Sequence, residues 1–275
     1  MAEMIDRPGL KAEMKELLRG AQVSPRGFTA LYLLLSLILT LVDSVANRGG
    51  AVSYDNPLGI FVRILTLLLS VVLSIGFILY CIAVRRGQRS EYLTLFDGFS
   101  FVGKVIGLAL LQTLFVFLWS CLFIVPGFVA AYRYQFAYFN LCENPELGCM
   151  DALELSKKQT MGYKAQLFTL DLSYLGWGLA ALLPTLVWIG YLTAGQSAYL
   201  LTDAAFEPVS TGVSLGIDLL CGLWAVAVRI FYLPAFRCTQ LGYYEIAKRT
   251  SGVSPLPNVN QPGIDDGGNS DIHPF

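Results

Sequence analysis

Long apolar runs separated by short polar segments dominate this chain. Six of these runs are predicted to span a membrane, namely 28–42, 60–84, 105–125, 128–141, 165–183 and 217–236. A helix needs about 20 residues to cross the hydrocarbon core, so the fourth run is short for a span. Pro126 and Gly127 favour a tight corner, which would join the third and fourth runs as a hairpin. The pattern predicts an all-α, polytopic membrane bundle of six transmembrane helices.

Positive charge is spread unevenly over the segments between these runs. Of the 19 Lys and Arg residues, only Arg48 lies in a predicted outer loop, and three lie within spans. Cytoplasmic loops carry an excess of Lys and Arg, so both termini are predicted to be cytoplasmic. If 105–141 crossed only once, Lys157, Lys158 and Lys164 would lie outside, so the charge distribution favours the hairpin.

The two ends of the chain differ from its middle. Residues 1–27 are charged and predict a short amphipathic helix on the cytoplasmic surface, followed by a transmembrane domain at 28–250. Residues 251–275 are rich in Gly, Pro, Asn and Asp, so they predict a disordered cytoplasmic tail. A small-x-small pattern at 44–46 also fits a signal-peptide cleavage site, but the long charged segment before the first run favours a retained anchor. The segment 184–216 contains no Lys or Arg and is expected in the outer interface or as a re-entrant piece.

A charged amphipathic helix is predicted between the fourth and fifth spans. It would start near Asp151, which is favourable at a helix N-terminus, and stop at Gly162, which suits a left-handed cap. Upstream, Asn144 and Pro145 predict a helix cap followed by proline at the first helical position. The side chains expected to lie on lipid or reach phosphates are Met150, Leu153, Met161, Lys157 and Lys158.

Charged residues inside the spans are the strongest candidates for function. Each costs on the order of 3 kcal/mol on insertion scales, so it usually faces a partner or water. Asp171 and Arg229 are both expected about 10 to 12 Å above the inner boundary, which predicts an ion pair between the fifth and sixth spans. Arg133 lies at a similar depth, and Asp218 falls on the polar stripe of the sixth span. This cluster fits a structural clamp or a proton or substrate site, and the stripes fit packing seams or a polar conduit.

Composition excludes several classes of function. Hydrophobic residues make up 55% of the chain and charged residues 14%, and the net charge of −1 gives no basic field for nucleic acid. The single histidine, His273, argues against histidine-based catalysis and metal sites, so we expect no metal and no cofactor. The six cysteines form no C-x-x-C pair, and a disulfide between Cys121 and Cys221, both near outer ends, is left open.

Several segments resemble a family of bacterial membrane proteins, the domain of unknown function 975. The segments are IVPGFVAAYRYQFAYFNLCENPE, DALELSKKQTMGYK, DLSYLGWGLAALLP, RGQRSEYLTLFDGF and LGYYEIAK. A weaker similarity is to the membrane domain of some bacterial glycerophosphodiester phosphodiesterases. The resemblance, over roughly residues 10–249, implies a polytopic protein of the bacterial plasma membrane. It implies no activity and no site residues.

Three functions fit these observations. The first is a non-catalytic accessory or scaffold protein that binds a membrane partner or lipid in the cell envelope. The second is a transporter or channel for a small solute or ion that uses Asp171 with Arg229 and Arg133, although no inverted repeat is visible. The third is an intramembrane enzyme, but the sequence lacks the paired carboxylates and the nucleophile beside a base that such an enzyme would use. The first function is favoured, and an enzyme is not expected.

Overall fold

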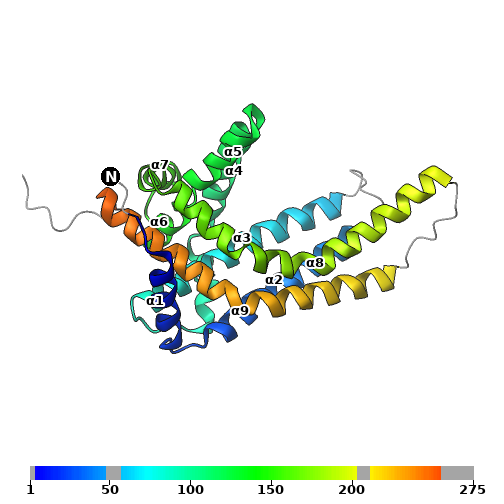
Figure 1. Ribbon diagram of the computed structural model, residues 1–275, viewed down its shortest axis with the longest axis horizontal. Coiled ribbons are helices and arrows are strands. Elements are labelled where there is room, and N and C mark those ends of the chain that lie inside the picture. The colour runs from blue at the N-terminus through cyan, green and yellow to red at the C-terminus, as the bar shows by residue number, and fades with distance from the viewer. Residues whose placement is uncertain (1–3, 48–56, 203–210, 255–275) are drawn as a thin grey trace, which may run out of the picture.

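The computed structural model describes residues 4–47, 57–202 and 211–254, and regular structure within these ranges is entirely helical (Figure 1). The predicted tail at 251–275 therefore lies mostly outside the described residues. The elements are α1 (Arg7–Arg19), α2 (Pro25–Asn47), α3 (Pro57–Arg85), the 3₁₀ helix η1 (Tyr92–Phe101), α4 (Val102–Leu122), α5 (Ile124–Arg133), α6 (Ala137–Glu143), α7 (Cys149–Gln159), α8 (Lys164–Thr202) and α9 (Thr211–Ser251).

Five stretches of the described chain are long and apolar enough to cross a membrane. They are Pro25–Asn47, Pro57–Arg85, Tyr92–Leu122, Lys164–Ala194 and Gly212–Ser251. Many apolar side chains of these helices are exposed on the protein surface, which is favourable only in contact with lipid. The helices therefore indicate a membrane-embedded protein. The all-α class expected from the hydrophobic pattern is confirmed.

The run predicted as the fourth span is divided between two short helices. α5 has 10 residues and α6 has 7, and Tyr134 between them leaves the helical conformation. Hydroxyl groups of α7 satisfy the backbone at this break: the Ser156 hydroxyl donates to the carbonyl of Arg133 at 2.9 Å and accepts from the amide of Phe136 at 3.1 Å. Neither helix alone is long enough to span a membrane.

Helices α2, α3, α8 and α9 run alongside one another and form the main bundle (Figure 1). Ser24 caps α2, because its Oγ accepts from the amide of Gly27 at 3.4 Å, and Pro25 occupies the first turn. Phe28 then stacks on Tyr80 of α3 with ring centroids 4.0 Å apart. The entry of α2 into the bundle is thereby fixed against α3.

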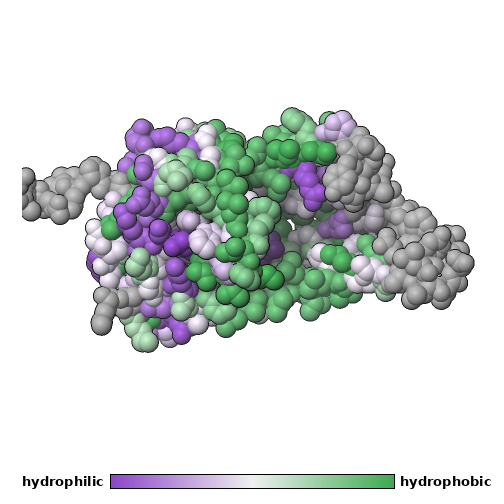
Figure 2. All heavy atoms as spheres, turned by 90° about the horizontal axis from the view of Figure 1, so that it is seen from above, coloured by the Kyte–Doolittle hydropathy of each residue, from purple (hydrophilic) through white to green (hydrophobic). Residues whose placement is uncertain are grey.

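Polar residues gather at one end of the molecule, which we call the polar end (Figure 2). It consists of α1, α6, α7 and the adjoining ends of α3, α8 and α9 (Figure 1). Leu10, Met14 and Leu18 of α1 are buried at the polar end, where α1 packs against α9. The charged residues of α1 lie on its other faces.

Helix α8 continues well past the end predicted for the fifth span. Its 39 residues include Pro184 and correspond to about 58 Å of helix, nearly twice the thickness of a hydrocarbon core. Residues 184–202 are therefore helical and continue α8. The segment 203–210 of the predicted outer link lies outside the described residues.

Helices α4 and α5 form an antiparallel hairpin that diverges from the main bundle (Figure 1). The chain turns at Phe123, whose backbone is extended, three residues before the predicted corner. Pro126 and Gly127 instead form the first turn of α5. Gly127 allows α5 to approach α4, since a Cβ at this position would overlap the side chain of Ser120.

The 3₁₀ helix η1 packs closely on α3 through two glycines. A Cβ at Gly76 would overlap the backbone carbonyl of Leu95, and a Cβ at Gly98 would lie 2.9 Å from the carbonyl oxygen of Val72. These contacts involve backbone atoms, which cannot rotate away. Glycine at both positions is therefore what allows the element to lie on α3.

Cysteines also join the helices of the bundle, but not as expected. The thiols of Cys81 on α3 and Cys238 on α9 lie 3.3 Å apart and are buried. Cys121 is exposed near the end of α4, Cys221 is buried on α9, and both are free thiols. The disulfide left open between Cys121 and Cys221 is not formed.

Candidate functional site

A buried carboxylate organises the charges of the polar end. Glu143, at the end of α6, has a side chain that is only 5% exposed. It accepts hydrogen bonds from Arg86 at 2.9 Å, from Lys248 at 2.6 Å and from the Tyr244 hydroxyl at 2.9 Å. Two cations and a hydroxyl offset the cost of burying this charge, so Glu143 joins α6 to α9 and to the segment after α3.

Further polar pairs extend this network. The amides of Asn140 and Gln159 exchange two hydrogen bonds of 2.9 Å between α6 and α7, and the Tyr244 hydroxyl oxygen lies 3.0 Å from the Oδ1 of Asn140. Arg85 bridges Glu13 of α1 at 2.9 Å and Glu245 of α9 at 2.7 Å. In the sequence, Arg85, Arg86 and Lys248 indicated only which segments are cytoplasmic. No local sequence pattern predicts that residues 140–146 contact residues 241–248.

Asp171 lies at the polar end and does not pair with Arg229. Its Oδ2 accepts from the Tyr132 hydroxyl at 2.8 Å, and the side chain of Gln240 also hydrogen bonds to it. Arg229 precedes Gln240 by 11 residues, about 16 Å along α9. The predicted ion pair is not formed, because Asp171 contacts Tyr132 and Gln240, whereas Arg229 lies about three turns away from Gln240 along α9.

The other charged residues of the predicted cluster are dispersed. Asp218 accepts from Ser44 of α2 at 3.2 Å near the opposite end of the bundle. Arg133 ends α5, and its carbonyl accepts from Ser156 and Thr160. The Nε of Arg133 and the Oδ1 of Asp171 are buried and have no hydrogen-bond partner in the described part of the chain. The four charged residues therefore do not form one site.

The predicted amphipathic helix corresponds to α7. Gly148 is its N-cap, Asp151 lies in its first turn, and Gly162 after its end has a φ of 88°, as the prediction of a left-handed cap requires. Met150, Lys157, Lys158 and Met161 are exposed, and their contact with the membrane surface stays a prediction. Leu153 is only 3% exposed and belongs to the core, so its assignment to lipid is wrong.

The corner before α7 also differs from the prediction. Asn144 ends α6, and its side-chain oxygen accepts from the amide of Glu146 at 3.1 Å. Pro145 follows in a turn, and the next helix begins only at Cys149. Asn144 and Pro145 thus form a side-chain-stabilised turn and do not start a helix.

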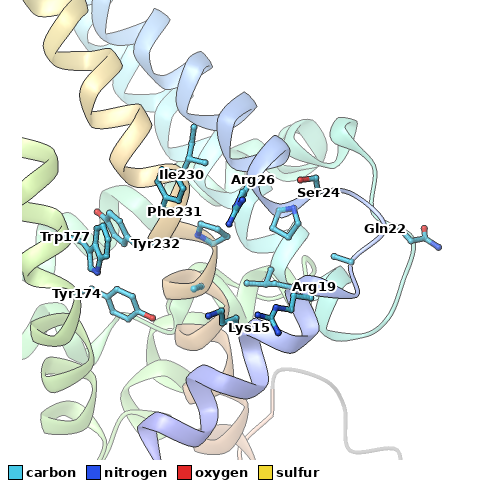
Figure 3. Close-up of a pocket in the computed structure, with 15 residues that line it drawn as sticks. Lys15, Arg19, Gln22, Ser24, Arg26, Tyr174, Trp177, Ile230, Phe231 and Tyr232 are labelled. Carbon is cyan, nitrogen blue, oxygen red and sulfur yellow. The ribbon is translucent and has the colours of Figure 1, made fainter.

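A hollow of about 850 Å³ lies where the polar end meets the apolar bundle (Figure 3). One side is formed by α1, the link after it and the first turn of α2, and the other side by α8 and α9. The first side contributes the cations Lys15, Arg19 and Arg26. The second side contributes the aromatic rings of Tyr174, Trp177, Phe231 and Tyr232. The hollow is therefore cationic on one side and aromatic on the other.

Local helix geometry positions these groups. Lys15 and Arg19 are one turn apart on α1 and share a face. Next along the same face, Lys11 donates to the hydroxyl of Ser173 at 2.8 Å and lies 4.3 Å from the ring centroid of Tyr174, which joins α1 to α8. Burial, and next the neighbouring Arg7 guanidinium, lower the pKa of Lys11.

Arg26 approaches the hollow from the opposite direction. Its guanidinium carbon lies 5.7 Å from the ring centroid of Phe231, within the range of a cation–π contact. Sequence reasoning missed this hollow, because the charges of α1 and the rings of α8 and α9 are far apart along the chain. The spacing of Lys11, Lys15 and Arg19 was its one visible signal.

Comparison with known proteins gives one match. The model of the family described as "Protein of unknown function (DUF975)" matches residues 122–250. This range runs from the end of α4 to the last turn of α9, so it includes Glu143, Asp171 and the aromatic side of the hollow. Lys15 and Arg26 precede it. No curated protein and no solved structure matches the chain significantly.

Proposed function

Because this chain belongs, through residues 122–250, to the DUF975 family, whose function is unknown, we propose a function from its geometry. The protein is a non-catalytic accessory protein of the bacterial plasma membrane that binds lipid at the hollow between α1, α8 and α9. A lipid held there would link the bilayer to the polar end, on which a membrane partner could assemble. The proposal includes no cofactor and no nucleic acid.

The hollow itself is the observation that carries this proposal. Tyr and Trp gather at membrane–water interfaces, where an amphipathic ring meets both environments. Tyr174, Trp177 and Tyr232 lie at such a boundary, between the polar end and the apolar helices (Figure 3). A lipid likewise joins a polar headgroup to apolar acyl chains, so it is the ligand class that fits this boundary.

The same geometry supports a topology with six crossings. In this arrangement the polar end is cytoplasmic, α4 crosses outward, and α5 with α6 returns to the cytoplasmic side. Phe123 would then face the outside, together with the ends of α2 and α8 at Asn47 and Thr202. The exposed Met150 and Met161 of α7 would rest on the inner surface of the bilayer beside Lys157 and Lys158.

The lipid-binding proposal is tested by native mass spectrometry of the purified protein. We expect lipid to remain bound to the wild-type protein after delipidation in detergent, and Trp177→Ala to lose most of it. Trp188→Ala is the matched control, because Trp188 lies further along α8 and does not line the hollow. Wild-type protein without bound lipid, or equal retention in the two variants, would refute the proposal.

A transporter is the second candidate, and the unpartnered atoms near α5 favour it. The buried Oδ1 of Asp171 and the buried Nε of Arg133 are respectively an acceptor and a donor that a small polar solute could satisfy. Arg229 does not contribute to this version of the site. Solute or proton flux in vesicles that Asp171→Asn abolishes would support a transporter, and unchanged flux in that variant would exclude this site.

A further inference from the structure

The hollow carries positive charge that is only partly compensated. Among the described residues, no Asp or Glu lines it, and no carboxylate forms an ion pair with Lys15 or Arg26. Arg19 is partly neutralised, since its Nη1 lies 2.7 Å from Glu16. A neutral ligand would leave the remaining charges unmatched, whereas an anion would balance them. The cationic side therefore selects for a negatively charged ligand.

The aromatic side requires an apolar part in the same ligand. Trp177 and Phe231 are both more than half exposed. Large aromatic rings contribute most to binding when another apolar group covers them. Arg26 lies over the Phe231 ring, so a cation and an apolar surface are adjacent at one edge of the hollow. A group bound by Arg26 is thus next to the position that an acyl chain would occupy.

We propose that the hollow binds an anionic phospholipid of the cytoplasmic leaflet. Its phosphate would be held by Lys15 and Arg26, and its acyl chains would lie along Trp177 and Phe231. This inference rests on the proposed lipid-binding function and adds the charge of the headgroup. Arginine and lysine both bind phosphate, arginine through two parallel hydrogen bonds and lysine as a point charge.

The lipid also has a consequence for α1. Helix α1 supplies Lys15, α2 supplies Arg26, and α8 and α9 supply the rings, so one ligand would contact four helices (Figure 3). Leu10, Met14 and Leu18 already hold α1 on the bundle without the lipid. The lipid would therefore add to an existing contact and leave the fold of the unliganded protein intact.

The experiment is a lipid titration of the purified full chain followed by native mass spectrometry. Phosphatidylglycerol and phosphatidylcholine with identical acyl chains are compared in wild-type protein, in Lys15→Gln/Arg26→Gln and in Arg89→Gln/Arg249→Gln. The second double variant is the matched control, because it also removes two cations at the polar end but none from the hollow. Each cation near anionic lipid contributes about 1 kcal/mol, so wild type should prefer phosphatidylglycerol by at least about tenfold.

We expect the preference to disappear in Lys15→Gln/Arg26→Gln and to persist in Arg89→Gln/Arg249→Gln. Equal binding of the two lipids by wild type would overturn the anionic inference and leave lipid binding intact. The absence of any bound lipid would overturn both. Loss of the preference in both double variants would assign it to general surface charge and contradict the hollow as its source.

Two additional measurements distinguish a bound lipid from a soluble anion and test the role of charge. Inorganic phosphate at a concentration that competes with phosphatidylglycerol would identify a soluble anion as the ligand and contradict the lipid. The charge-conserving variant Lys15→Arg/Arg26→Lys should keep the preference, and its loss there would also contradict the assignment. If Lys15→Gln/Arg26→Gln does not fold, the single changes Lys15→Gln and Arg26→Gln decide, each with an expected drop of several fold in the preference.

Discussion

At the scale of single residues, buried polar groups decide how the polar end is assembled. Glu143 accepts from Arg86, Lys248 and Tyr244, which belong to segments far apart in the sequence. An ion pair of this kind contributes little net stability compared with apolar packing, but breaking it leaves buried charges without partners. Removal of one member should therefore be costly.

We expect Glu143→Gln to lower the free energy of unfolding by about 3 kcal/mol, because Arg86 and Lys248 would lose their carboxylate. Thermal unfolding in detergent, followed by the loss of soluble protein, measures the effect. Glu154→Gln is the control, since the Glu154–Lys158 pair is exposed and its loss should leave the unfolding temperature unchanged. Equal unfolding temperatures in the two variants would show that Glu143 is not a structural hub.

The hydrogen bond between Tyr132 and Asp171 gives a second prediction at this scale. Tyr132→Phe and Asp171→Asn should each lower the free energy of unfolding. In the double variant the decrease should be about 1 kcal/mol smaller than the sum of the two single decreases, because the two side chains share one hydrogen bond. Adding Arg229→Gln to Asp171→Asn should restore nothing. Recovery of stability in that variant would instead support an ion pair between Asp171 and Arg229.

At the scale of elements, close approach of backbones depends on a few glycines. Gly76→Ala should displace η1 from α3 and cost about 1 to 3 kcal/mol, because its Cβ would overlap the backbone of Leu95. Gly103→Ala on α4 should be harmless, as no other atom lies within 4 Å of its added Cβ. Unfolding temperatures of the two variants measure the difference, and similar values would contradict the close packing of η1.

Hydrophobic runs predicted the long helices well and the short elements poorly. Apolar periodicity located the helices that became α2, α3, α4, α8 and α9, because burial in lipid requires long uninterrupted runs. It could not show that Ser156 and Thr160 would stabilise a break after Arg133, since that depends on tertiary contacts. It also could not show that η1 would lie on α3, because the relevant contact joins Gly76 to the distant Leu95.

At the scale of the whole molecule, the position of the membrane boundary determines which residues are within reach of lipid. Counting from Lys164 placed Asp171 at the same depth as Arg229, whereas the packing of α8 against α5 and α9 places it beside Tyr132 and Gln240. The helix α7 and the left-handed conformation of Gly162 after its end were predictable from local sequence alone. The hollow was not, because its cations and rings meet only after α1 folds back on the bundle.

The arrangement of the polar end and the α4–α5 hairpin across the membrane is the central claim, and cysteine labelling in intact cells tests it most directly. In a background with Cys121→Ser, Val125→Cys and Lys158→Cys are each exposed to a membrane-impermeant maleimide before and after permeabilisation. We predict that Val125→Cys is labelled in intact cells and that Lys158→Cys is labelled only after permeabilisation. Labelling of Lys158→Cys in intact cells, or protection of Val125→Cys there, would contradict the account.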